Sequence, residues 1–287
     1  MICSLCPRKC GALRDAAHRG FCGVGDEPVV ARAAPHFWEE PCISGTRGSG
    51  AVFFTGCALR CVFCQNHDIS AGSKGKTVSV DRLRAIFREL EAQGVHNLNL
   101  VTASHFLPAV LEALEPVPSV PVVWNTGGYE SIPALRALEG KVQVYLPDMK
   151  YMDGALAARL SRAEDYPEVA QAAILEMFRQ TGPYVLDESG MLVRGVMIRH
   201  LVLPGELDNT FSVLDWIREA FRPGDVLVSL MGQYTPNGLG GPDRRLTREE
   251  YQRAVDYMAA LGLLEGYTQE LSSAESEYTP PFDGMGV

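Results

Sequence analysis

The sequence predicts an α/β protein: a full or partial (β/α)6 barrel of parallel strands, preceded by a small cysteine-rich, metal-binding amino-terminal segment. Three observations support this fold class. Short apolar runs alternate with segments of helical periodicity, chemically unusual residues follow several of these runs, and all eight cysteines lie within the first 64 residues. Apolar strands that alternate with helices are typical of a buried parallel sheet, which right-handed crossovers curl toward a barrel.

The predicted barrel begins with the apolar run at 51–55, which ends at Gly56 and leads into a cysteine-rich loop. From Val80 to Leu90, apolar residues recur at three-and-four spacing, which indicates an amphipathic helix that ends near Gly94. The same alternation then repeats. Further strands are expected at about 97–102, 121–125, 142–147, 196–203 and 226–231, and helices at about 106–114, 132–138, 169–178 and 211–221.

The chain divides into three segments by residue composition and periodicity. Residues 1–50 are rich in Cys, Gly, Pro and Arg and show no sustained period, so we expect an irregular segment held by a metal. Residues 51–262 make up the barrel. Residues 263–287 again show no clear period, and they are expected to pack as an extended carboxyl-terminal tail.

The composition indicates a folded protein without general affinity for nucleic acid. Of 287 residues, 46% are hydrophobic and 21% are charged, which allows one sizeable core. The net charge of -9 disfavours nucleic-acid binding through a generally basic surface. No apolar run reaches the roughly 18 residues of a membrane span, and the opening MICSLCPRKC lacks the apolar core of a secretory signal. We therefore expect a cytoplasmic protein that does not bind membranes.

Cys57, Cys61 and Cys64 form the motif C-x3-C-x2-C in one loop after the first barrel strand. A reducing compartment keeps thiols free, which favours metal binding over disulfides for clustered cysteines. Three soft thiolates suit an iron-sulfur cluster, and the missing fourth ligand leaves one iron open to a small molecule. The alternatives are a zinc knuckle that lacks one ligand and three buried thiols without a metal.

Cys3, Cys6, Cys10 and Cys22 predict a second metal centre, because C-x2-C-x3-C and one further cysteine offer four thiolates within a short segment. The metal is either a structural zinc or an auxiliary iron-sulfur cluster. Zinc is slightly preferred, since a closed site would anchor an irregular segment without redox chemistry. Free structural cysteines are the alternative. Cys42 stands apart from both groups.

The loop of Cys57, Cys61 and Cys64, with the aromatic Phe63 before its last cysteine, resembles the radical S-adenosylmethionine (SAM) superfamily. The resemblance extends over nearly the whole chain to the subfamily of pyruvate formate-lyase activating enzymes. It is carried by CPRKCG at 6–11, GSGAVFFTGCALRCVFCQNHDIS at 48–70, NLVTASHF at 99–106, WNTGGYE at 124–130, YLPDMKYMD at 145–153, RHLVLPG at 199–205 and LMGQYTP at 230–236. It implies a [4Fe-4S] cluster that binds SAM at its open iron and, once reduced, cleaves SAM to methionine and a 5'-deoxyadenosyl radical that abstracts hydrogen from a substrate.

The same resemblance assigns residues to the cofactor site, Phe63 among them. Asp148 and Lys150 match an Asp-x-Lys pattern that lies beside SAM, and a local ion pair is the alternative for them. Arg199 matches an arginine that holds SAM, with an exposed surface arginine as the alternative. Two further matches near the same end of the barrel are Asn125 and Thr126.

The chain departs from its relatives after the second barrel strand, where many of them bind the SAM amino group through Gly-Gly-Glu. This chain has Thr102-Ala103-Ser104-His105, so hydroxyl and backbone groups are expected to replace that contact. His105 is interpreted as a structural histidine, with a substrate-side acid or base as the alternative. Gly127 and Gly128 would let another group approach the backbone closely, and a simple turn after the strand is the alternative.

Three functions fit these features. The first is an activating enzyme that makes a glycyl radical on a partner enzyme, and the second is a radical SAM enzyme that acts directly on a small molecule or another macromolecule. Both need an external one-electron donor, such as a flavodoxin or ferredoxin. The third is a non-catalytic iron-sulfur or zinc protein. The first rests on resemblance alone, because activating enzymes with extra cysteines usually carry them in an insertion after the cluster motif, which this chain lacks.

Overall fold

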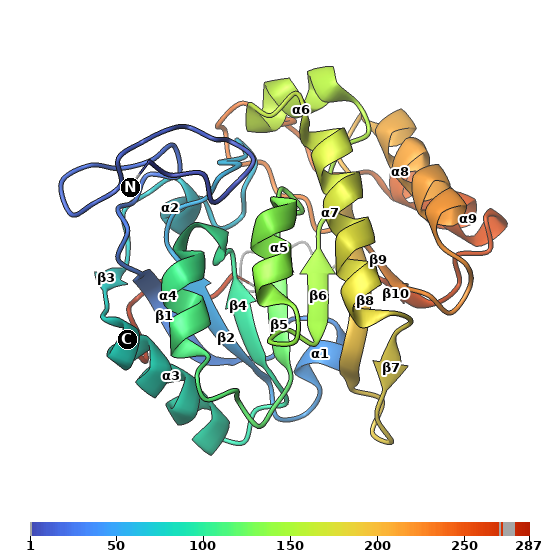
Figure 1. Cartoon of the computed structure of the whole chain (residues 1–287). Coiled ribbons are helices and arrows are strands. Elements are labelled where there is room, and N and C mark those ends of the chain that lie inside the picture. Colours follow the sequence, from blue (N-terminus) through green and yellow to red (C-terminus); the bar gives the residue numbers. More distant parts are fainter. Residues whose placement is uncertain (1, 270, 272–278) are drawn as a thin grey trace.

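The computed structural model describes residues 2–269, 271 and 279–287, and a twisted sheet forms its centre (Figure 1). Its parallel strands are β2 (Ser49–Phe54), β4 (Leu98–Val101), β5 (Val122–Thr126), β6 (Val144–Pro147), β8 (Leu192–Leu201), β9 (Leu227–Met231) and β10 (Gly266–Thr268). The first six of these are the predicted barrel strands. Three further strands are antiparallel to their neighbours: β1 (Val29–His36), β3 (Lys76–Thr77) and β7 (Val185–Leu186).

The strand order is β10-β9-β8-β6-β5-β4-β2-β1-β3, with β7 paired to β8. Because the described sheet ends at β10 on one side and at β3 on the other, it is an open, mostly parallel sheet. This is the partial form of the predicted barrel.

Helices pack on the outer face of the sheet (Figure 1). Five correspond to the predicted helical patterns: α3 (Val80–Ala92), α4 (Leu107–Ala113), α5 (Ile132–Leu138), α7 (Tyr166–Thr181) and α8 (Leu207–Ala220). The sequence analysis did not identify α6 (Gly154–Ser161) or α9 (Arg248–Ala260). Three shorter elements are α1 (Pro41–Ser44), α2 (His67–Ser70) and the 3-10 turn η1 (Ser104–Phe106).

Side chains alternate between the two faces of the sheet, as strand geometry requires. In β5, Val122 and Trp124 belong to the large core under the helices, whereas Val123 joins a separate cluster on the inner face. That inner cluster includes Cys42 and Ile43 of α1, both buried. Helix α1 therefore fills the inner face near the amino-terminal ends of the strands, and the carboxyl-terminal ends remain available for a site.

The expectation of an irregular amino-terminal segment is wrong for residues 29–36, which form β1 and pair with β2 through a bulge. The carboxyl-terminal segment also contributes to the sheet. Tyr267 pairs with Ser229 as part of β10, and the backbone of Ala33 donates to the carbonyl of Met285 at 2.9 Å. The division of the chain at residues 50 and 262 stays a prediction.

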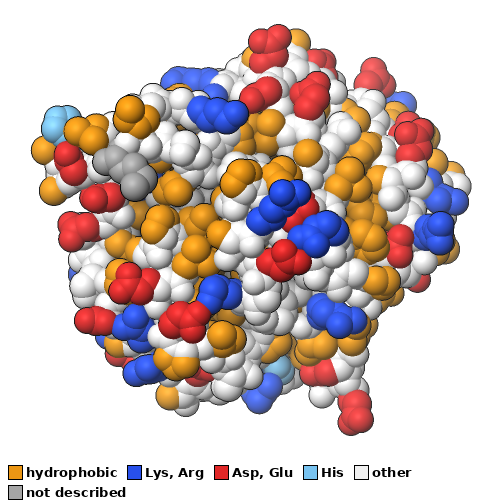
Figure 2. Space-filling view, in the orientation of Figure 1, with side chains coloured by type: hydrophobic (Ala, Val, Ile, Leu, Met, Phe, Trp, Pro, Cys, Tyr) orange, Lys and Arg blue, Asp and Glu red, His pale blue; other side chains and the backbone are white. Residues whose placement is uncertain are grey.

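The surface agrees with the mixed charge of the sequence. On the face shown in Figure 2, Lys and Arg side chains are interspersed with Asp and Glu, and apolar side chains lie between them. No helix in the described ranges is both long and apolar enough to span a bilayer. The cytoplasmic location stays a prediction.

Candidate functional site

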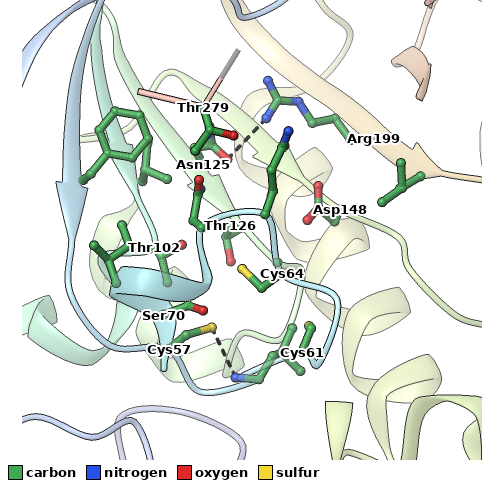
Figure 3. A pocket seen from close by; sticks show the side chains of 18 of the residues that line it. Cys57, Cys61, Cys64, Ser70, Thr102, Asn125, Thr126, Asp148, Arg199 and Thr279 are labelled. Atoms are coloured by element: carbon green, nitrogen blue, oxygen red, sulfur yellow. Dashed lines mark hydrogen bonds between the residues drawn. The ribbon is translucent and has the colours of Figure 1, made fainter. Parts of the chain in front are cut away.

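A pocket opens at the carboxyl-terminal ends of the parallel strands, and side chains that follow six successive strands line it (Figure 3). In a parallel sheet these strand ends meet at one edge, which is where α/β proteins place their functional groups. The lining residues include Cys57, Cys61, Phe63, Cys64, Thr102, Asn125, Thr126, Asp148, Lys150, Arg199, Gln233 and Tyr234. The structure therefore brings together the residues that the sequence analysis assigned to the SAM site.

The three thiols lie in the loop between β2 and α2. Figure 3 shows them on one side of the pocket, facing Thr126, Asp148 and Arg199. The loop is held by local hydrogen bonds: the Leu59 amide donates to the Cys57 sulfur at 3.3 Å, and the Cys64 amide donates to the Cys61 carbonyl at 3.1 Å.

Burial and a neighbouring sulfur oppose the ionisation of Cys57 and Cys64. Burial and the neighbouring sulfur of Cys61 raise the pKa of Cys57 to about 12, and the same two causes raise the pKa of Cys64. Ionising all three would place three negative charges in a poorly solvated loop. A bound cationic metal group would remove this penalty, because metal coordination stabilises thiolates.

Phe63 packs inside the cysteine loop and does not extend into solvent. Its ring makes an edge-on contact with Tyr151 at a centroid distance of 6.5 Å and a tilted contact with Tyr234 at 6.2 Å. It is 8% exposed and forms part of the pocket wall. The aromatic residue of the motif therefore joins the loop to the strand ends.

Asp148 and Lys150 form an ion pair at the pocket surface. Burial has the largest single effect on Lys150 and lowers its pKa, but Asp148 together with the nearby Cys61 and Tyr166 raises the pKa above its ordinary value. The Tyr166 hydroxyl accepts from the Lys150 amide at 2.9 Å and bonds the Asp148 carbonyl at 2.8 Å, which fixes the backbone between them. The local ion pair is present, and because both members also line the pocket, their place beside SAM stays a prediction.

Gly128 shows why glycine follows β5. Its φ is +81°, and a Cβ there would lie 2.2 Å from the carbonyl oxygen of Asp148. No L side chain fits both the left-handed backbone and this approach. Gly128 therefore permits a close approach between two backbone segments: its own, after β5, and that of Asp148, after β6.

A buried carboxylate, Glu130, organises the hydroxyl groups around β4 and β5. Its Oε1 accepts from the hydroxyls of Ser104 and Thr126 and, at 3.3 Å, from the indole of Trp124. Thr102 lines the pocket with a left-handed φ of +59°, an unusual conformation for a β-branched residue. The sequence analysis missed Glu130, although it ends the conspicuous segment WNTGGYE.

Arg199 is buried at the inner end of the pocket between two carboxylates. It forms ion pairs with Glu39 and, at 2.6 Å, with Glu40, and its exposure is only 11%. The alternative of an exposed surface arginine is therefore wrong. Glu39 also accepts from the amides of Asn99 at 3.0 Å and Asn125 at 3.2 Å. Neither glutamate was predicted as a site residue, because both lie in the segment between β1 and α1.

Comparison with known proteins identifies the family. Residues 51–146 match the model of the radical SAM superfamily. An uncharacterized protein of Methanocaldococcus jannaschii is 31% identical over 269 residues, which cover 88% of this chain and 73% of that protein. The chain belongs to the radical SAM superfamily. Membership implies a [4Fe-4S] cluster, SAM binding and cleavage of SAM by radical chemistry.

Solved structures resemble this radical SAM protein at low sequence identity. Streptococcus suis SuiB bound to its precursor peptide SuiA has a TM-score of 0.49 at 14% identity, over 77% of this chain and 48% of SuiB. A domain of a pyruvate-formate lyase-activating enzyme from Bacteroides vulgatus has a TM-score of 0.39 at 12% identity, over 67% of this chain and 91% of that domain. Methylornithine synthase has a TM-score of 0.47 at 14% identity, over 76% and 70% of the two chains.

The residues present fit the cofactors of the family. Three soft sulfur ligands share one loop and border an open pocket, as a cluster with one free iron requires. The opposite wall offers a cation, carboxylates, hydroxyls and amides, which match the amino acid portion of SAM. Phe53, Leu59 and Leu201 add apolar surface to the lining.

The amino-terminal cysteines lie close to one another behind the cysteine loop. Burial first, and then the neighbouring sulfurs of Cys22 and Cys3, raise the pKa of Cys6 to about 11. Cys22 is buried and also interacts with Cys10, which is exposed. Within the described part of the chain, no three Cys, His, Asp or Glu side chains lie close enough together to hold a single metal ion. A metal at these four cysteines therefore stays a prediction.

His105 has a structural environment. It is 3% exposed, and its Nε2 lies 2.8 Å from the carbonyl of Thr55. Burial lowers its pKa to about 4, so the ring is neutral at physiological pH. It is absent from the residues that line the pocket, and this environment supports the structural interpretation over a substrate-side acid or base.

Proposed function

We propose that Cys57, Cys61 and Cys64 hold the [4Fe-4S] cluster of this radical SAM enzyme, and that the pocket above them binds SAM and presents it with the substrate. The observation that carries the proposal is that the three thiols and the charged and polar side chains of five further strand ends line one pocket. When bound and reduced by an external donor such as a flavodoxin or ferredoxin, the cluster supplies the electron that cleaves SAM.

The residues of the pocket supply binding and orientation. Lys150 is a partly buried cation suited to the carboxylate of SAM, and Asp148 beside it is suited to the amino group. Thr102 presents a polar group where relatives carry Gly-Gly-Glu, and Asn125 and Thr126 add an amide and a hydroxyl from the next strand. We assign these contacts from residue chemistry and from their shared place in the pocket.

The main task of the protein is placement. Hydrogen abstraction by a carbon radical needs the reacting atoms nearly in contact and protected from water. Apolar side chains from several elements, Phe53, Leu59, Phe63 and Leu201 among them, border the pocket and limit the room for water. No residue has to act as an acid or base in this step.

For the substrate, we propose a glycyl radical enzyme as the partner, on the motif similarity to activating enzymes. Direct action on a small molecule or another macromolecule is the competing proposal. Incubating the reduced enzyme and SAM with each candidate substrate distinguishes them: a glycine-centred radical on a partner protein supports the first, and deuterium transfer from a labelled small molecule into 5'-deoxyadenosine supports the second.

The central test is turnover. Anaerobically reconstituted protein should be brown, bind SAM and produce 5'-deoxyadenosine after reduction. Changing Cys57, Cys61 and Cys64 together to Ala should abolish SAM binding and 5'-deoxyadenosine production, whereas Cys42→Ala, at a buried cysteine of the inner cluster, should keep both. Undiminished SAM cleavage in the triple variant would contradict the proposal, and so would a correctly loaded parent that never cleaves SAM.

We also propose a second metal centre at Cys3, Cys6, Cys10 and Cys22, with zinc slightly preferred. Metal analysis of the triple variant decides its identity, because the SAM-cluster ligands are then absent. About one zinc per chain supports a structural site, and about four irons show an auxiliary cluster. If neither metal is present and the four thiols react freely with a thiol reagent, the second centre does not exist.

A further inference from the structure

The loop of residues 6–10, between the second and third cysteines, packs directly against the cysteine loop of the SAM site. Its central residue, Arg8, reaches across to two other parts of the chain. The Arg8 Nε donates to the carbonyl of Ala58 at 2.7 Å, and its guanidinium also donates to the carbonyls of Ser161, at 2.6 Å, and Arg162. One side chain thus joins the amino-terminal segment, the cysteine loop and the end of α6.

This position favours an arginine for physical reasons. Ser161 and Arg162 end α6, so their carbonyls lie at the negative end of the helix dipole and attract a cation. The planar guanidinium offers several donors at once, which a lysine cannot do. It also stacks on the ring of Phe21, 4.2 Å from the centroid.

A second set of contacts joins the same two segments. The Cys57 amide donates to the carbonyl of Cys22 at 3.2 Å, and the Arg60 side chain donates to the carbonyl of Phe21 at 3.3 Å. Gly56 permits this approach, because its φ is +91° and a Cβ there would lie 2.8 Å from the Cys22 carbonyl oxygen. The amino-terminal segment therefore holds the first half of the cysteine loop at Cys57, Ala58 and Arg60.

The end of α6 in turn touches a sulfur of the cysteine loop. The Ser161 hydroxyl donates to Cys61 Sγ at 3.0 Å and lies 2.7 Å from the Tyr151 hydroxyl. Ser161 is fully buried, so no water competes for this contact. Hydrogen bonds to the sulfur ligands of an iron-sulfur cluster stabilise its reduced form and raise its reduction potential.

We propose that the loop of residues 6–10 is a positioning clamp for the SAM cluster: Arg8 fixes Ala58 and the end of α6, so that Ser161 donates a hydrogen bond to the Cys61 ligand and tunes the cluster. This inference rests on the proposed function, in which Cys61 is a cluster ligand. Arg8 and Ser161 are positioning residues, because neither lines the pocket.

The test measures the cluster itself. Parent, Ser161→Ala, Tyr151→Phe, Arg8→Ala and Arg8→Lys proteins are reconstituted anaerobically, and iron content and midpoint potential are measured by redox titration with electron paramagnetic resonance. The signal that changes when SAM is added identifies the SAM cluster. Thermal melts confirm that each variant is folded. Lys9→Ala is the matched control, because it removes a positive charge from an exposed neighbour in the same loop.

We expect Ser161→Ala to keep the cluster at a lower midpoint potential, with a smaller shift in the same direction for Tyr151→Phe. Arg8→Ala should lower both the midpoint potential and the cluster content. Arg8→Lys should give values of both between those of Arg8→Ala and the parent, and Lys9→Ala should give the values of the parent. Unchanged potentials and contents in the Ser161 and Arg8 variants would overturn the clamp alone. A parent that takes up no SAM-responsive cluster would overturn the proposed function, and the clamp with it.

Discussion

At the scale of single residues, Glu130 shows how burial and hydrogen bonding compete. All three of its donors bind Oε1, whereas Oε2 is buried without a hydrogen-bond partner among the described residues. Burial raises the pKa of this carboxyl above its ordinary value. A proton on Glu130 is therefore bound more tightly in the folded state. The stability it confers is complete below the ordinary pKa of Glu, about 4.3, and is lost as pH rises through the folded value.

We therefore predict that Glu130→Gln keeps the hydrogen bonds from Ser104, Thr126 and Trp124. It should also remove the free-energy cost of burying an ionised carboxylate, which grows as pH rises. The amide retains one oxygen for the three donors, so the variant should melt at or above the parent temperature at pH 8, with a difference that shrinks toward pH 5. Glu130→Ala should melt lower at both pH values, because three donors lose their acceptor. Thermal melts from pH 5 to 8 check this, and a Gln variant that loses most stability at pH 8 would refute the account.

At the scale of elements, α9 depends on one carboxylate for its start. Thr247 and Glu250 form a capping box, and Glu250 also binds Arg244 at 2.6 Å and the amide of Gly205 at 2.9 Å. The hydrogen-bonded Arg244 holds the pKa of Glu250 far below its usual range. Glu250 therefore joins two loops near the strand ends to the helix.

Glu250→Gln is expected to lower stability by up to about 1 kcal/mol at pH 7, because the amide can keep the capping-box hydrogen bond but loses the ion pair with Arg244. Because the folded pKa is depressed, the stabilising effect is present above the ordinary Glu pKa and fades as pH falls below about 4. Urea denaturation at pH 7 and at lower pH measures the difference. Glu249→Gln, at the exposed neighbouring position, is the control and should match the parent. If both variants lost the same free energy of unfolding, the cause would be the missing negative charge and not the specific contacts of Glu250.

The same scale shows what the sequence could predict. Strong apolar runs predicted β2, β4 and β5, because a strand that is buried on both faces is apolar along most of its length and is easily recognised in the sequence. The missed helix α9 buries only Tyr251, Ala254 and Met258, too narrow a stripe to be recognised among charged residues. Strand β10 has three residues at the edge of the sheet and gains its conformation from pairing with β9.

For the site, the sequence could predict that residues which directly follow strands lie together, because the carboxyl ends of parallel strands meet at one edge of the sheet. Their roles toward a cofactor stay predictions. Glu39, Glu40, Arg8 and Ser161 were not predicted. Their roles depend on contacts between segments about 50 to 160 positions apart, which no local pattern records. Sequence spacing identifies the candidate thiol ligands, whereas the groups proposed to orient them are found only in the folded chain.

At the scale of the whole molecule, the last residues of the chain complete the pocket. Thr279 and Pro280 line it, Phe282 contacts the ring of Phe53 at a centroid distance of 5.6 Å, and Asp283 pairs with Arg32 at 2.9 Å. Since Phe53 also borders the pocket, this segment supports a wall of the site.

We predict that Phe282→Ala weakens SAM binding several-fold and lowers the melting temperature, because the support behind Phe53 is lost. Leu264→Ala is the control, since Leu264 is 74% exposed and should change neither property. Equilibrium binding of SAM to the reconstituted proteins, together with thermal melts, tests this. A Phe282 variant that binds SAM like the parent would show that the segment covers the pocket without shaping it.

The closed inner end of the pocket has a kinetic consequence. Helix α1 fills the inner face of the sheet, and Arg199 with its two glutamates lies across the end of the cavity. We therefore expect a molecule that binds against this closed end to arrive before one that binds near the mouth, and to leave after it. The order of binding and release would then be fixed: a second reactant at the entrance would keep the first from leaving, and the products of the first would leave only after the second.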